Sequence, residues 1–345
     1  MGFWTNQLSG PTDPAVDAAW ESREPRKGFF TDTSICIGCK ACEVACKEWN
    51  AIPEDGLSLL GASYDNTGAL GASTWRHVAF IEQTSERIEQ ARESGRRLVD
   101  LGMPSLRTSG ASDPVTAGVG PAAAPPGTDP VADRAAAVAQ ADAAQALGTV
   151  PDFRWLMASD VCKHCTHAGC LDVCPTGALF RTEFGTVVVQ DDVCNGCGYC
   201  VAACPFGVIE RREGDETVKN VGVAQKCTLC YDRLRDDQTP ACAQACPTTS
   251  IKFGDLDEMR ALASERVTTL HDNGYTEARL YGADPHDGVG GTGSVFLLLD
   301  EPEVYGLPPD PRVTTADLPD MFRKAGFAGV AMLAMAAVSF LGRRR

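Results

Sequence analysis

Short apolar runs separated by polar and proline-containing segments make up most of the chain. The clearest local pattern lies at residues 178–190, where Leu179-Phe180 and Val187-Val188-Val189 flank a turn at residues 183–185. Two apolar runs joined by a short turn are typical of a β-hairpin. Short strands are predicted at residues 178–180, 208–210, 250–253 and 294–299. The pattern therefore predicts several small β elements.

Residues 256–273 have helical periodicity instead. The apolar positions that fall roughly on one face are Met259, Leu262, Val267 and Leu270. Gly274 follows directly and is a suitable C-cap. Further along, residues 301–320 contain five prolines. Because proline removes a backbone donor and fixes φ, this stretch is predicted to be an extended strap.

The longest apolar segment is the last one. Residues 325–342 carry no charge over 18 positions, which is the minimum length for a membrane span. The alternative is a buried terminal helix, but a helix of a soluble domain normally has a polar face. Residues 321–345 are therefore expected to form a single C-terminal transmembrane helix with a basic end. Its many small residues would let helices of a membrane partner approach closely.

Two segments lack the pattern of a folded element. Residues 1–28 are polar and contain three prolines, which predicts an extended N-terminal arm. Residues 106–150 are a low-complexity insertion, because more than half of residues 110–148 are Ala, Gly or Pro and none is aromatic. Such a composition is typical of a mobile linker.

The overall charge narrows the range of partners. The 345 residues include 31 Lys and Arg against 46 Asp and Glu, a net charge of −15. This acidity argues against nucleic-acid binding, which requires a positive field. The hydrophobic content of 44% excludes global disorder.

Sixteen cysteines change the picture, because they fall into four groups of four with none left over. The groups are Cys36, Cys39, Cys42 and Cys46; Cys162, Cys165, Cys170 and Cys174; Cys194, Cys197, Cys200 and Cys204; and Cys227, Cys230, Cys242 and Cys246. The first and third have the spacing C-x2-C-x2-C-x3-C, and proline follows the last cysteine in three of the groups. This spacing is that of bacterial ferredoxins, whose thiolates hold [4Fe–4S] clusters.

Two other uses of cysteine fit less well. Structural zinc is bound by two C-x2-C pairs across a longer loop, which only the fourth group resembles. Disulfides require an oxidising compartment, and cysteines in such tight runs are poorly placed to bridge. Sixteen thiolates therefore predict four [4Fe–4S] clusters bound through iron. A zinc-stabilised binding scaffold remains the alternative of a different class.

The ferredoxin pattern also predicts which cysteines share a cluster. In a two-cluster ferredoxin, the fourth cysteine of each run ligates the neighbouring cluster. The second and third groups lie close together in the chain and exchange in this way, which leaves the first and fourth to pair across the chain. The predicted ligand sets are Cys36, Cys39, Cys42 and Cys246 (cluster 1); Cys162, Cys165, Cys170 and Cys204 (cluster 2); Cys194, Cys197, Cys200 and Cys174 (cluster 3); and Cys227, Cys230, Cys242 and Cys46 (cluster 4).

This pairing predicts an α+β protein with two nested ferredoxin-like dicluster modules. The first module is discontinuous and the second is inserted within it. The predicted division is residues 29–105 and 215–255 for module 1, 151–214 for module 2, and 256–320 for the helix, strand and proline-rich strap; the arm, the insertion and the C-terminal helix complete the chain.

No catalytic constellation accompanies the cysteines in the sequence. We find no nucleophile–base pair and no pterin or flavin motif, and the glycine-rich residues 288–293 do not lie between a strand and a helix, so a loop is predicted there. Lys40, Lys163 and Lys226 each adjoin a predicted ligand. They either raise a cluster's potential by their charge or are solvated surface lysines.

Together these features resemble the iron–sulfur (β) subunit of membrane-bound respiratory formate dehydrogenase. The resemblance runs from about Gly28 to the C-terminus, apart from the insertion. It rests on CIGCKACEVACKEWN (36–50), CKHCTHAGCLDVCPTGAL (162–179), CNGCGYCVAACPFGV (194–208) and KCTLCYDRLRDDQTPACAQACPT (226–248). The cysteine pattern alone is shared by β subunits of many molybdopterin oxidoreductases. The tail GVGGTGSVFLLLDEPEVYGLPPDPRV (288–313), followed by one C-terminal helix, looks specifically like the formate dehydrogenase type.

The resemblance implies an electron-transfer subunit with no catalytic site of its own. Electrons from a formate-oxidising catalytic subunit with a molybdenum or tungsten pterin would cross the four clusters to a membrane cytochrome b or similar quinone-linked subunit. The alternative is the equivalent subunit of a thiosulfate, polysulfide or sulfoxide reductase, or of a hydrogenase.

The chain's expected location follows from its two ends. We expect no signal peptide, because no apolar run follows the first residues. The arginines at residues 343–345 favour a cytoplasmic C-terminus. A single-pass protein of the cytoplasmic membrane is therefore expected, with its cluster domain on the extracytoplasmic face and exported with a signal-bearing partner.

Overall fold

The computed structural model describes residues 20, 24–55, 67–100, 153–215, 217–315 and 318–342. Helices and strands are mixed along these residues, as the sequence predicts for an α+β protein. The low-complexity insertion at residues 106–150, most of the arm at residues 1–28 and the basic residues 343–345 lie outside the described residues.

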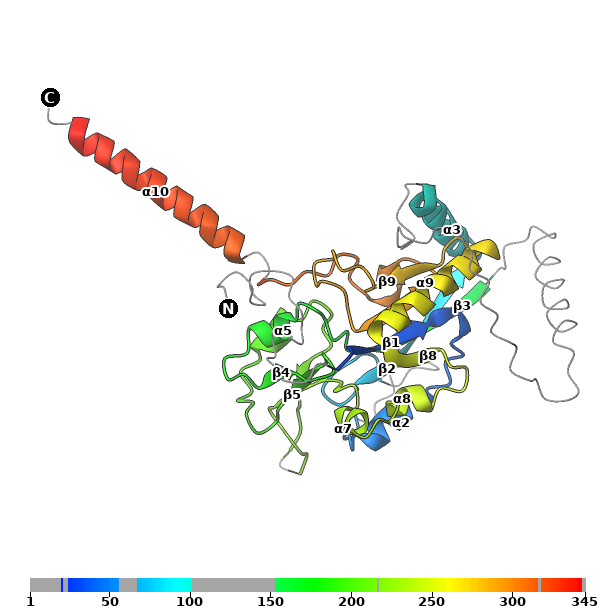
Figure 1. Ribbon diagram of the computed structural model, residues 1–345. Helices are drawn as coiled ribbons and strands as arrows, with labels where there is room; N and C mark the ends of the chain where they lie inside the picture. Colours follow the sequence, from blue (N-terminus) through cyan, green and yellow to red (C-terminus); the bar gives the residue numbers. More distant parts are fainter. Residues whose placement is uncertain are drawn as a thin grey trace, which may run out of the picture.

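A four-stranded sheet lies at the centre of the larger part of the molecule (Figure 1). Its strand order is β8 (Ile251–Asp255), β1 (Lys27–Asp32), β10 (Ser294–Leu298) and β9 (Arg279–Tyr281). β1 runs parallel to β10, with Phe29 opposite Ser294, and antiparallel to β8, with Phe29 opposite Phe253. Every residue of β10 is buried, which accounts for its continuous apolar run. The strands predicted at residues 250–253 and 294–299 are confirmed.

The helix predicted at residues 256–273 is also confirmed as α9 (Leu256–Asp272), which packs against β1, β8 and β10. Its buried face includes Met259, Ala263 and Leu270. Leu262, expected on that face, is 43% exposed. The face that contacts the sheet is therefore narrower than the hydrophobic pattern predicts.

Two long strands, β2 (Arg76–Thr84) and β3 (Phe153–Val161), do not follow from the hydrophobic pattern. They pair antiparallel along their whole length, from Arg76 opposite Val161 to Thr84 opposite Phe153. Helix α3 (Ser85–Asp100) continues directly from β2. The two strands thus bring together the parts of the chain before and after residues 101–152. Cys162, which follows β3, lies beside the start of β2.

A smaller region contains the predicted hairpin, with β4 (Leu179–Arg181) antiparallel to β5 (Val187–Val189). The short helices α5 (Gly169–Asp172) and α6 (Tyr199–Ala203) pack against each other beside it. A second short pair consists of β6 (Glu210–Arg211) and β7 (Ala224–Gln225). A separate cluster of buried side chains, including Leu179, Val187 and Ile209, holds this region together.

Three further helices come from two distant parts of the chain. They are α2 (Ala41–Trp49), α7 (Tyr231–Arg235) and α8 (Ala241–Gln244). Although distant in sequence, α2 packs against α8. Two short 3-10 helices, η2 (Thr33–Ile35) and η3 (Pro302–Tyr305), are also present. η3 lies in the predicted proline-rich strap.

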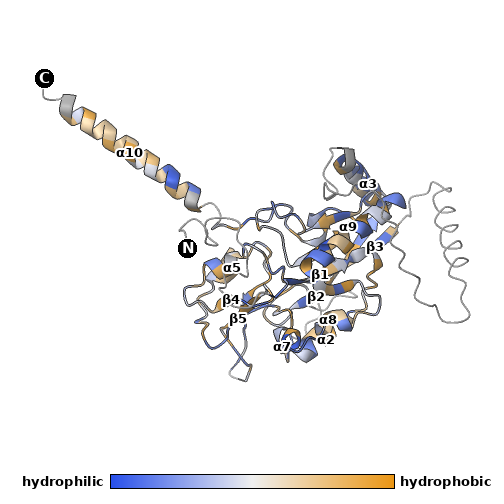
Figure 2. Cartoon of the chain, in the orientation of Figure 1, coloured by the Kyte–Doolittle hydropathy of each residue, from blue (hydrophilic) through white to orange (hydrophobic). Residues whose placement is uncertain are grey.

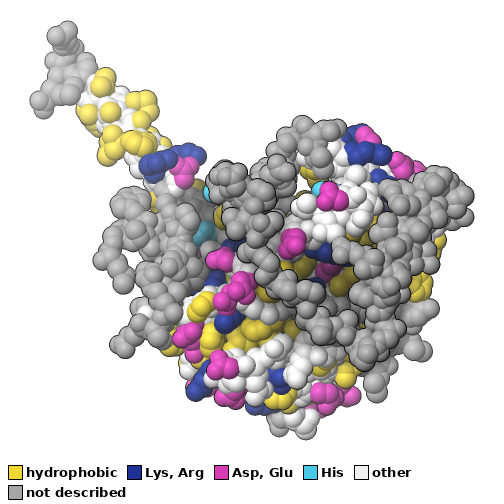
Figure 3. All heavy atoms as spheres, turned by 45° about the vertical axis from the view of Figure 1, so that its right-hand side comes forward, with side chains coloured by type: hydrophobic (Ala, Val, Ile, Leu, Met, Phe, Trp, Pro, Cys, Tyr) yellow, Lys and Arg dark blue, Asp and Glu magenta, His cyan; other side chains and the backbone are white. Residues whose placement is uncertain are grey.

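Helix α10 (Leu318–Gly342) extends away from the rest of the molecule (Figure 1) and is mostly apolar (Figure 2). Its segment Asp320–Phe340 is long and apolar enough to cross a membrane, and none of it is buried. Figure 3 shows hydrophobic side chains along the helix and charged ones at its inner end, where Arg323 and Lys324 pair with Asp320. The helix begins earlier than expected because Pro319 is accepted in its first turn.

Candidate iron–sulfur cluster sites

The cysteines predicted for cluster 1 meet at one cavity. Its sulfur-bearing residues are Cys36, Cys39, Cys42 and Cys246. The loop between η2 and α2 turns through Gly38 and Lys40, with φ values of 65° and 59°. A Cβ at position 38 would lie 2.6 Å from the ring of Phe80, so glycine is needed there for space as well as conformation. The packing of α2 on α8 brings Cys246 to this loop.

The cysteines predicted for cluster 4 are all buried. They are Cys46, Cys227, Cys230 and Cys242. Asn50, the residue after α2, joins the two halves, because its Nδ2 lies 3.7 Å from Cys46 Sγ and 4.0 Å from Cys230 Sγ. Burial, and then the charges of Cys227 and Cys242, raise the pKa of Cys46 well above its ordinary value. The structure thus brings Cys46 of α2 to the cysteines around α7 and α8.

A second cavity contains the cysteines predicted for cluster 2. They are Cys162, Cys165, Cys170 and Cys204. Helices α5 and α6 approach closely here, since a Cβ at Gly169 would lie 2.8 Å from the carbonyl oxygen of Ala203. Burial, and then the neighbouring sulfurs of Cys162 and Cys204, raise the pKa of Cys165.

The cysteines predicted for cluster 3 lie beside the β4–β5 hairpin. They are Cys174, Cys194, Cys197 and Cys200. Burial raises the pKa of Cys200 to about 11, and the charges of Cys194 and Cys174 contribute next. Cys174 follows α5 and Cys194 follows the hairpin, so the antiparallel return of β5 brings the two runs together.

The residues around these sulfurs suit iron–sulfur clusters. All sixteen cysteines are free thiols, which disagrees with the disulfide alternative. No carboxylate of the described residues lines the cavities at the cluster 1 and cluster 2 cysteines. Among the described residues, no group of three or more His, Cys, Asp or Glu side chains is arranged to hold a single metal ion. A backbone amide also donates to sulfur, from Leu229 N to Cys227 Sγ at 3.3 Å, as ferredoxin-type loops do.

The four sites are neighbours in a row. Burial is the main cause that raises the pKa of Cys42, and the charge of Cys242 in the next site adds to it. Burial and then the charge of Cys162 raise the pKa of Cys227. Burial raises the pKa of Cys170 to about 12, with a further contribution from Cys200. Cys42 and Cys46 also lie on one helix, α2, and Lys226, which precedes Cys227, lines the cavity of the cluster 2 cysteines. The cysteine sets predicted for clusters 1, 4, 2 and 3 are therefore neighbours in that order.

The most exposed cysteines lie at the two ends of this row. Cys39 at one end and Cys197 at the other are exposed, whereas the remaining cysteines are buried or half-buried. Apolar side chains are exposed beside each of them: Ile37 is 58% exposed and Tyr199 is 61% exposed.

The three lysines beside the cysteines differ in their surroundings. Lys163 and Lys226 are almost fully buried, so the interpretation as solvated surface lysines is wrong for both. Lys163 Nζ donates to the carboxylate of Asp160 and lies 5.0 Å from the ring centre of Phe296. Lys40 instead forms an ion pair with Glu43 at 3.2 Å. Two of the three are therefore fixed buried cations next to cysteine sites.

The glycine-rich residues 288–293 form a loop, as expected, and the loop supports the cluster 2 cysteines. Backbone hydrogen bonds run from His167 N to Val289 O at 2.8 Å and from Gly293 N to Lys163 O at 2.8 Å. A Cβ at Gly290, whose φ is 70°, would lie 2.5 Å from the ring of His167. The glycines thus let this loop lie directly against the cysteine-bearing segment.

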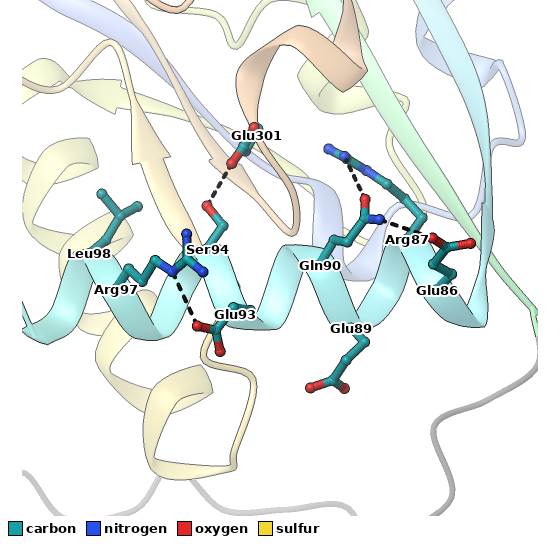
Figure 4. Close-up of a pocket in the computed structure, with 9 residues that line it drawn as sticks. All are labelled: Glu86, Arg87, Glu89, Gln90, Glu93, Ser94, Arg97, Leu98 and Glu301. Atoms are coloured by element: carbon teal, nitrogen blue, oxygen red, sulfur yellow. Dashed lines mark hydrogen bonds and ion pairs between the residues drawn. The ribbon is translucent and has the colours of Figure 1, made fainter.

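A surface pocket along α3 lies apart from the cysteines (Figure 4). Its side chains bond mainly with one another: Ser94 donates to Glu301 at 2.6 Å, and Arg97 to Glu93 at 3.1 Å. In the part of the chain that the structure describes, no cysteine or aromatic residue lines it. We therefore assign it no part in the redox site.

Several polar residues at the sites are not predictable from the cysteine motifs. Ser159 Oγ lies 3.2 Å from Cys42 Sγ, and Arg76 Nη1 donates to the same oxygen at 3.0 Å. Both residues lie on the β2–β3 pair, far from any cysteine run except that of Cys162. The motif carries no signal for them, because the contact depends on the pairing of distant strands.

Comparison with known proteins agrees with this reading of the cysteines. Residues 153–256 match the family model of a 4Fe-4S dicluster domain. The formate dehydrogenase iron–sulfur subunit of Haemophilus influenzae is 35% identical over 287 residues, covering 82% of this chain and 68% of the relative. The nitrate-inducible formate dehydrogenase iron–sulfur subunit of Escherichia coli is 34% identical over 289 residues, covering 83% and 73%.

A relative of another enzyme type matches a shorter part. The thiosulfate reductase electron transfer subunit PhsB of Salmonella typhi is 49% identical over 115 residues, covering 33% of this chain and 56% of the relative. The similarity to the two formate dehydrogenase subunits extends over a much larger share of the chain.

Proposed function

The chain belongs to the family of formate dehydrogenase iron–sulfur subunits, and we propose that it conducts electrons through four [4Fe–4S] clusters between two partner subunits. The chain is an iron–sulfur electron-transfer subunit of formate dehydrogenase-like oxidoreductases. Its own residues bind the clusters and exclude water from them, and no catalytic site of its own is proposed.

The proposed ligands are the four cysteine sets defined above as clusters 1 to 4. The observation that carries this proposal is the meeting of cysteines from distant parts of the chain. Cys246 lines the same cavity as Cys36, and Asn50 contacts both Cys46 and Cys230. A bound [4Fe–4S] cluster supplies one-electron redox chemistry through iron held by thiolates. Clusters 1 and 4 then form a discontinuous module, with clusters 2 and 3 in a second module inserted within it.

The row of sites supports a single route through the protein. Electrons enter and leave at the sites of clusters 1 and 3, where Cys39 and Cys197 are exposed. The buried cysteines of cluster 4 and the buried or half-buried ones of cluster 2 lie between these ends. Such a line keeps the inner sites away from water and places one partner at each end.

The proposed electron donor is a catalytic subunit that oxidises formate at a molybdenum or tungsten pterin. The proposed acceptor is a membrane cytochrome b or similar quinone-linked subunit, against which the exposed helix α10 packs. The apolar segment Asp320–Phe340 supports anchoring in the membrane. The cluster domain then faces the extracytoplasmic side, after export of the loaded protein with a partner that carries a signal.

The substrate is tested by purifying the chain from membranes with its bound partners and assaying formate-dependent dye reduction. Reduction with formate and none with thiosulfate supports the proposal. The PhsB similarity makes thiosulfate the specific competing substrate. Activity with thiosulfate but not formate would keep the electron-transfer role and replace the catalytic partner.

A further inference from the structure

Arg76, the first residue of β2, is a buried cation that forms no ion pair with a carboxylate among the described residues. Its side chain is 2% exposed, and its guanidinium carbon lies 4.9 Å from the ring centre of Phe29. An arginine side chain keeps its charge in a protein. Its burial therefore requires acceptors or negative charge nearby.

Among the described residues, only one nitrogen atom of the Arg76 guanidinium has hydrogen-bond acceptors. Nη1 donates to the carbonyl oxygen and the hydroxyl oxygen of Ser159, at 3.3 Å and 3.0 Å. Nε and Nη2 are buried and have no partner among the described residues. Buried Nε atoms without a partner recur in other arginines, including Arg212, but Arg76 also has an Nη2 without a partner among the described residues. A buried guanidinium with two such donors requires an explanation.

The negative groups around the guanidinium are cysteine sulfurs. Burial lowers the pKa of Arg76, but the charges of four cysteines raise it above its ordinary value. In decreasing order of effect they are Cys242, Cys42, Cys227 and Cys46. Cys42 belongs to the proposed ligands of cluster 1, and the other three to those of cluster 4. The contact through Ser159, which lies 3.2 Å from Cys42 Sγ, independently places Arg76 at the cluster 1 site. Arg76 also lines the same cavity as Cys46, one of the proposed ligands of cluster 4.

We propose that Arg76 is a counter-charge shared by clusters 1 and 4, whose Nε and Nη2 donate to sulfur atoms of these clusters and whose charge raises both reduction potentials. The proposal rests on the proposed function, from which it takes the ligand sets. One-electron reduction adds one negative charge to a site that already carries four thiolates. A fixed cation in a dry site stabilises that added charge more than it stabilises the oxidised state.

The cation lies at the first junction of the proposed route. By acting on clusters 1 and 4 together, it raises both potentials relative to those of clusters 2 and 3. The specific consequence is that one substitution changes two potentials and leaves two unchanged.

Arg212 provides a matched control. It is also buried, at 5% exposure, but its Nη1 and Nη2 donate to the backbone carbonyls of Lys219 and Ala72 at 3.1 Å and 2.9 Å. Burial lowers its pKa, and the one charge that opposes this is Asp191, not a cysteine. Loss of its charge should therefore leave every cluster potential unchanged.

The experiment compares the full-length, cluster-loaded chain with Arg76→Gln, Arg76→Lys and Arg212→Gln. Iron content is measured first, and the four midpoint potentials are then measured by redox titration followed by electron paramagnetic resonance. Cys42→Ser and Cys227→Ser variants identify the signals of clusters 1 and 4. A wild-type protein that does not hold four clusters would refute the proposed function, which separates that failure from a failure of this inference.

The inference predicts lower potentials for clusters 1 and 4 in Arg76→Gln, partial recovery in Arg76→Lys, and no shift in Arg212→Gln. Four unchanged potentials in Arg76→Gln, or an equal shift of all four, would overturn it. If Arg76→Gln loses iron, retention of iron in Arg76→Lys supports a charge requirement, whereas equal loss in both contradicts it. Pulsed resonance on wild-type protein labelled with nitrogen-15 arginine should also detect nitrogen coupling to reduced clusters 1 and 4, and its absence there counts against the inference.

Discussion

The sulfur of Cys42 lies 3.2 Å from the hydroxyl oxygen of Ser159, although the two residues are 117 positions apart in the chain. Ser159 belongs to β3, and its partner strand β2 begins at Arg76. The contact joins the start of helix α2, in the first cysteine run, to the strand that leads to the second run. A polar group at this position can stabilise negative charge on the sulfur.

Ser159→Ala should lower the reduction potential of cluster 1 specifically. The hydroxyl hydrogen bond to a thiolate is worth about 1 kcal/mol, which for a one-electron step corresponds to roughly 40 mV. Redox titration checks this. Ser250→Ala is the control, because Ser250 lines the same cavity but donates to the carbonyl of Asp32 at 2.7 Å. An equal shift in both variants would mean that cavity shape, not the sulfur contact, sets the potential.

Asn50 should act on cluster 4 in the same way. Its Nδ2 donates to the carbonyl of Cys46 at 2.8 Å and lies near the sulfurs of Cys46 and Cys230. Asn50→Ala removes the amide donor and should lower that potential by roughly 40 mV, the equivalent of about 1 kcal/mol. Asn50→Asp places a carboxylate there and should lower it further. If the Asp variant has the higher potential of the two, the electrostatic explanation fails.

The cross-chain pairing predicts that two similar substitutions affect two different clusters. Cys246→Ser should change the spectrum of the cluster bound by Cys36 and Cys42, and Cys46→Ser should change that of the cluster bound by Cys227 and Cys242. Serine binds iron less well than cysteine, so each variant should lose or shift one signal of the four. The reverse assignment, with Cys246→Ser altering the cluster of Cys227, would show that each run binds its own cluster.

The ligand sets could be predicted from the cysteine spacing because the ferredoxin run is a local pattern with a fixed chemical meaning. The apolar pattern also predicts β4, β5, β10 and α9, whose buried residues are continuous or periodic. It does not predict that β1 and β10 pair in parallel, nor that β2 and β3 join across residues 101–152. Strand partners depend on contacts between distant residues, which periodicity does not record. Arg76 and Ser159 were missed for the same reason.

Removal of residues 318–345 should release the protein from membranes without loss of iron. Helix α10 is exposed along its length and extends away from the cysteine sites, so the folded part does not depend on it. Iron per chain and the fraction in the membrane pellet are the two measurements. A variant lacking only residues 343–345 is the control and should stay with the membrane. A parallel fall in iron would make α10 part of the fold.

Gly326 and Gly329 should matter for assembly but not for the chain's own stability. Nothing lies within 4 Å of a Cβ built on either glycine. If α10 packs closely on partner helices, Gly329→Leu should reduce the amount of membrane partner that copurifies, because small residues permit close helix contact. Iron content should not change. Val330→Leu, which exchanges one bulky residue for another, should retain the partner; equal loss in both variants would contradict close packing at the glycine.

The central claim is that the sixteen cysteines hold four [4Fe–4S] clusters, and metal analysis with Mössbauer spectroscopy tests it most directly. The full-length protein, purified without air from its own membranes, should contain one iron and one acid-labile sulfide for each of its sixteen cysteines, with every iron in the [4Fe–4S] spectrum. A colourless protein loaded with zinc, or one with iron for only half of the cysteines, would contradict the account.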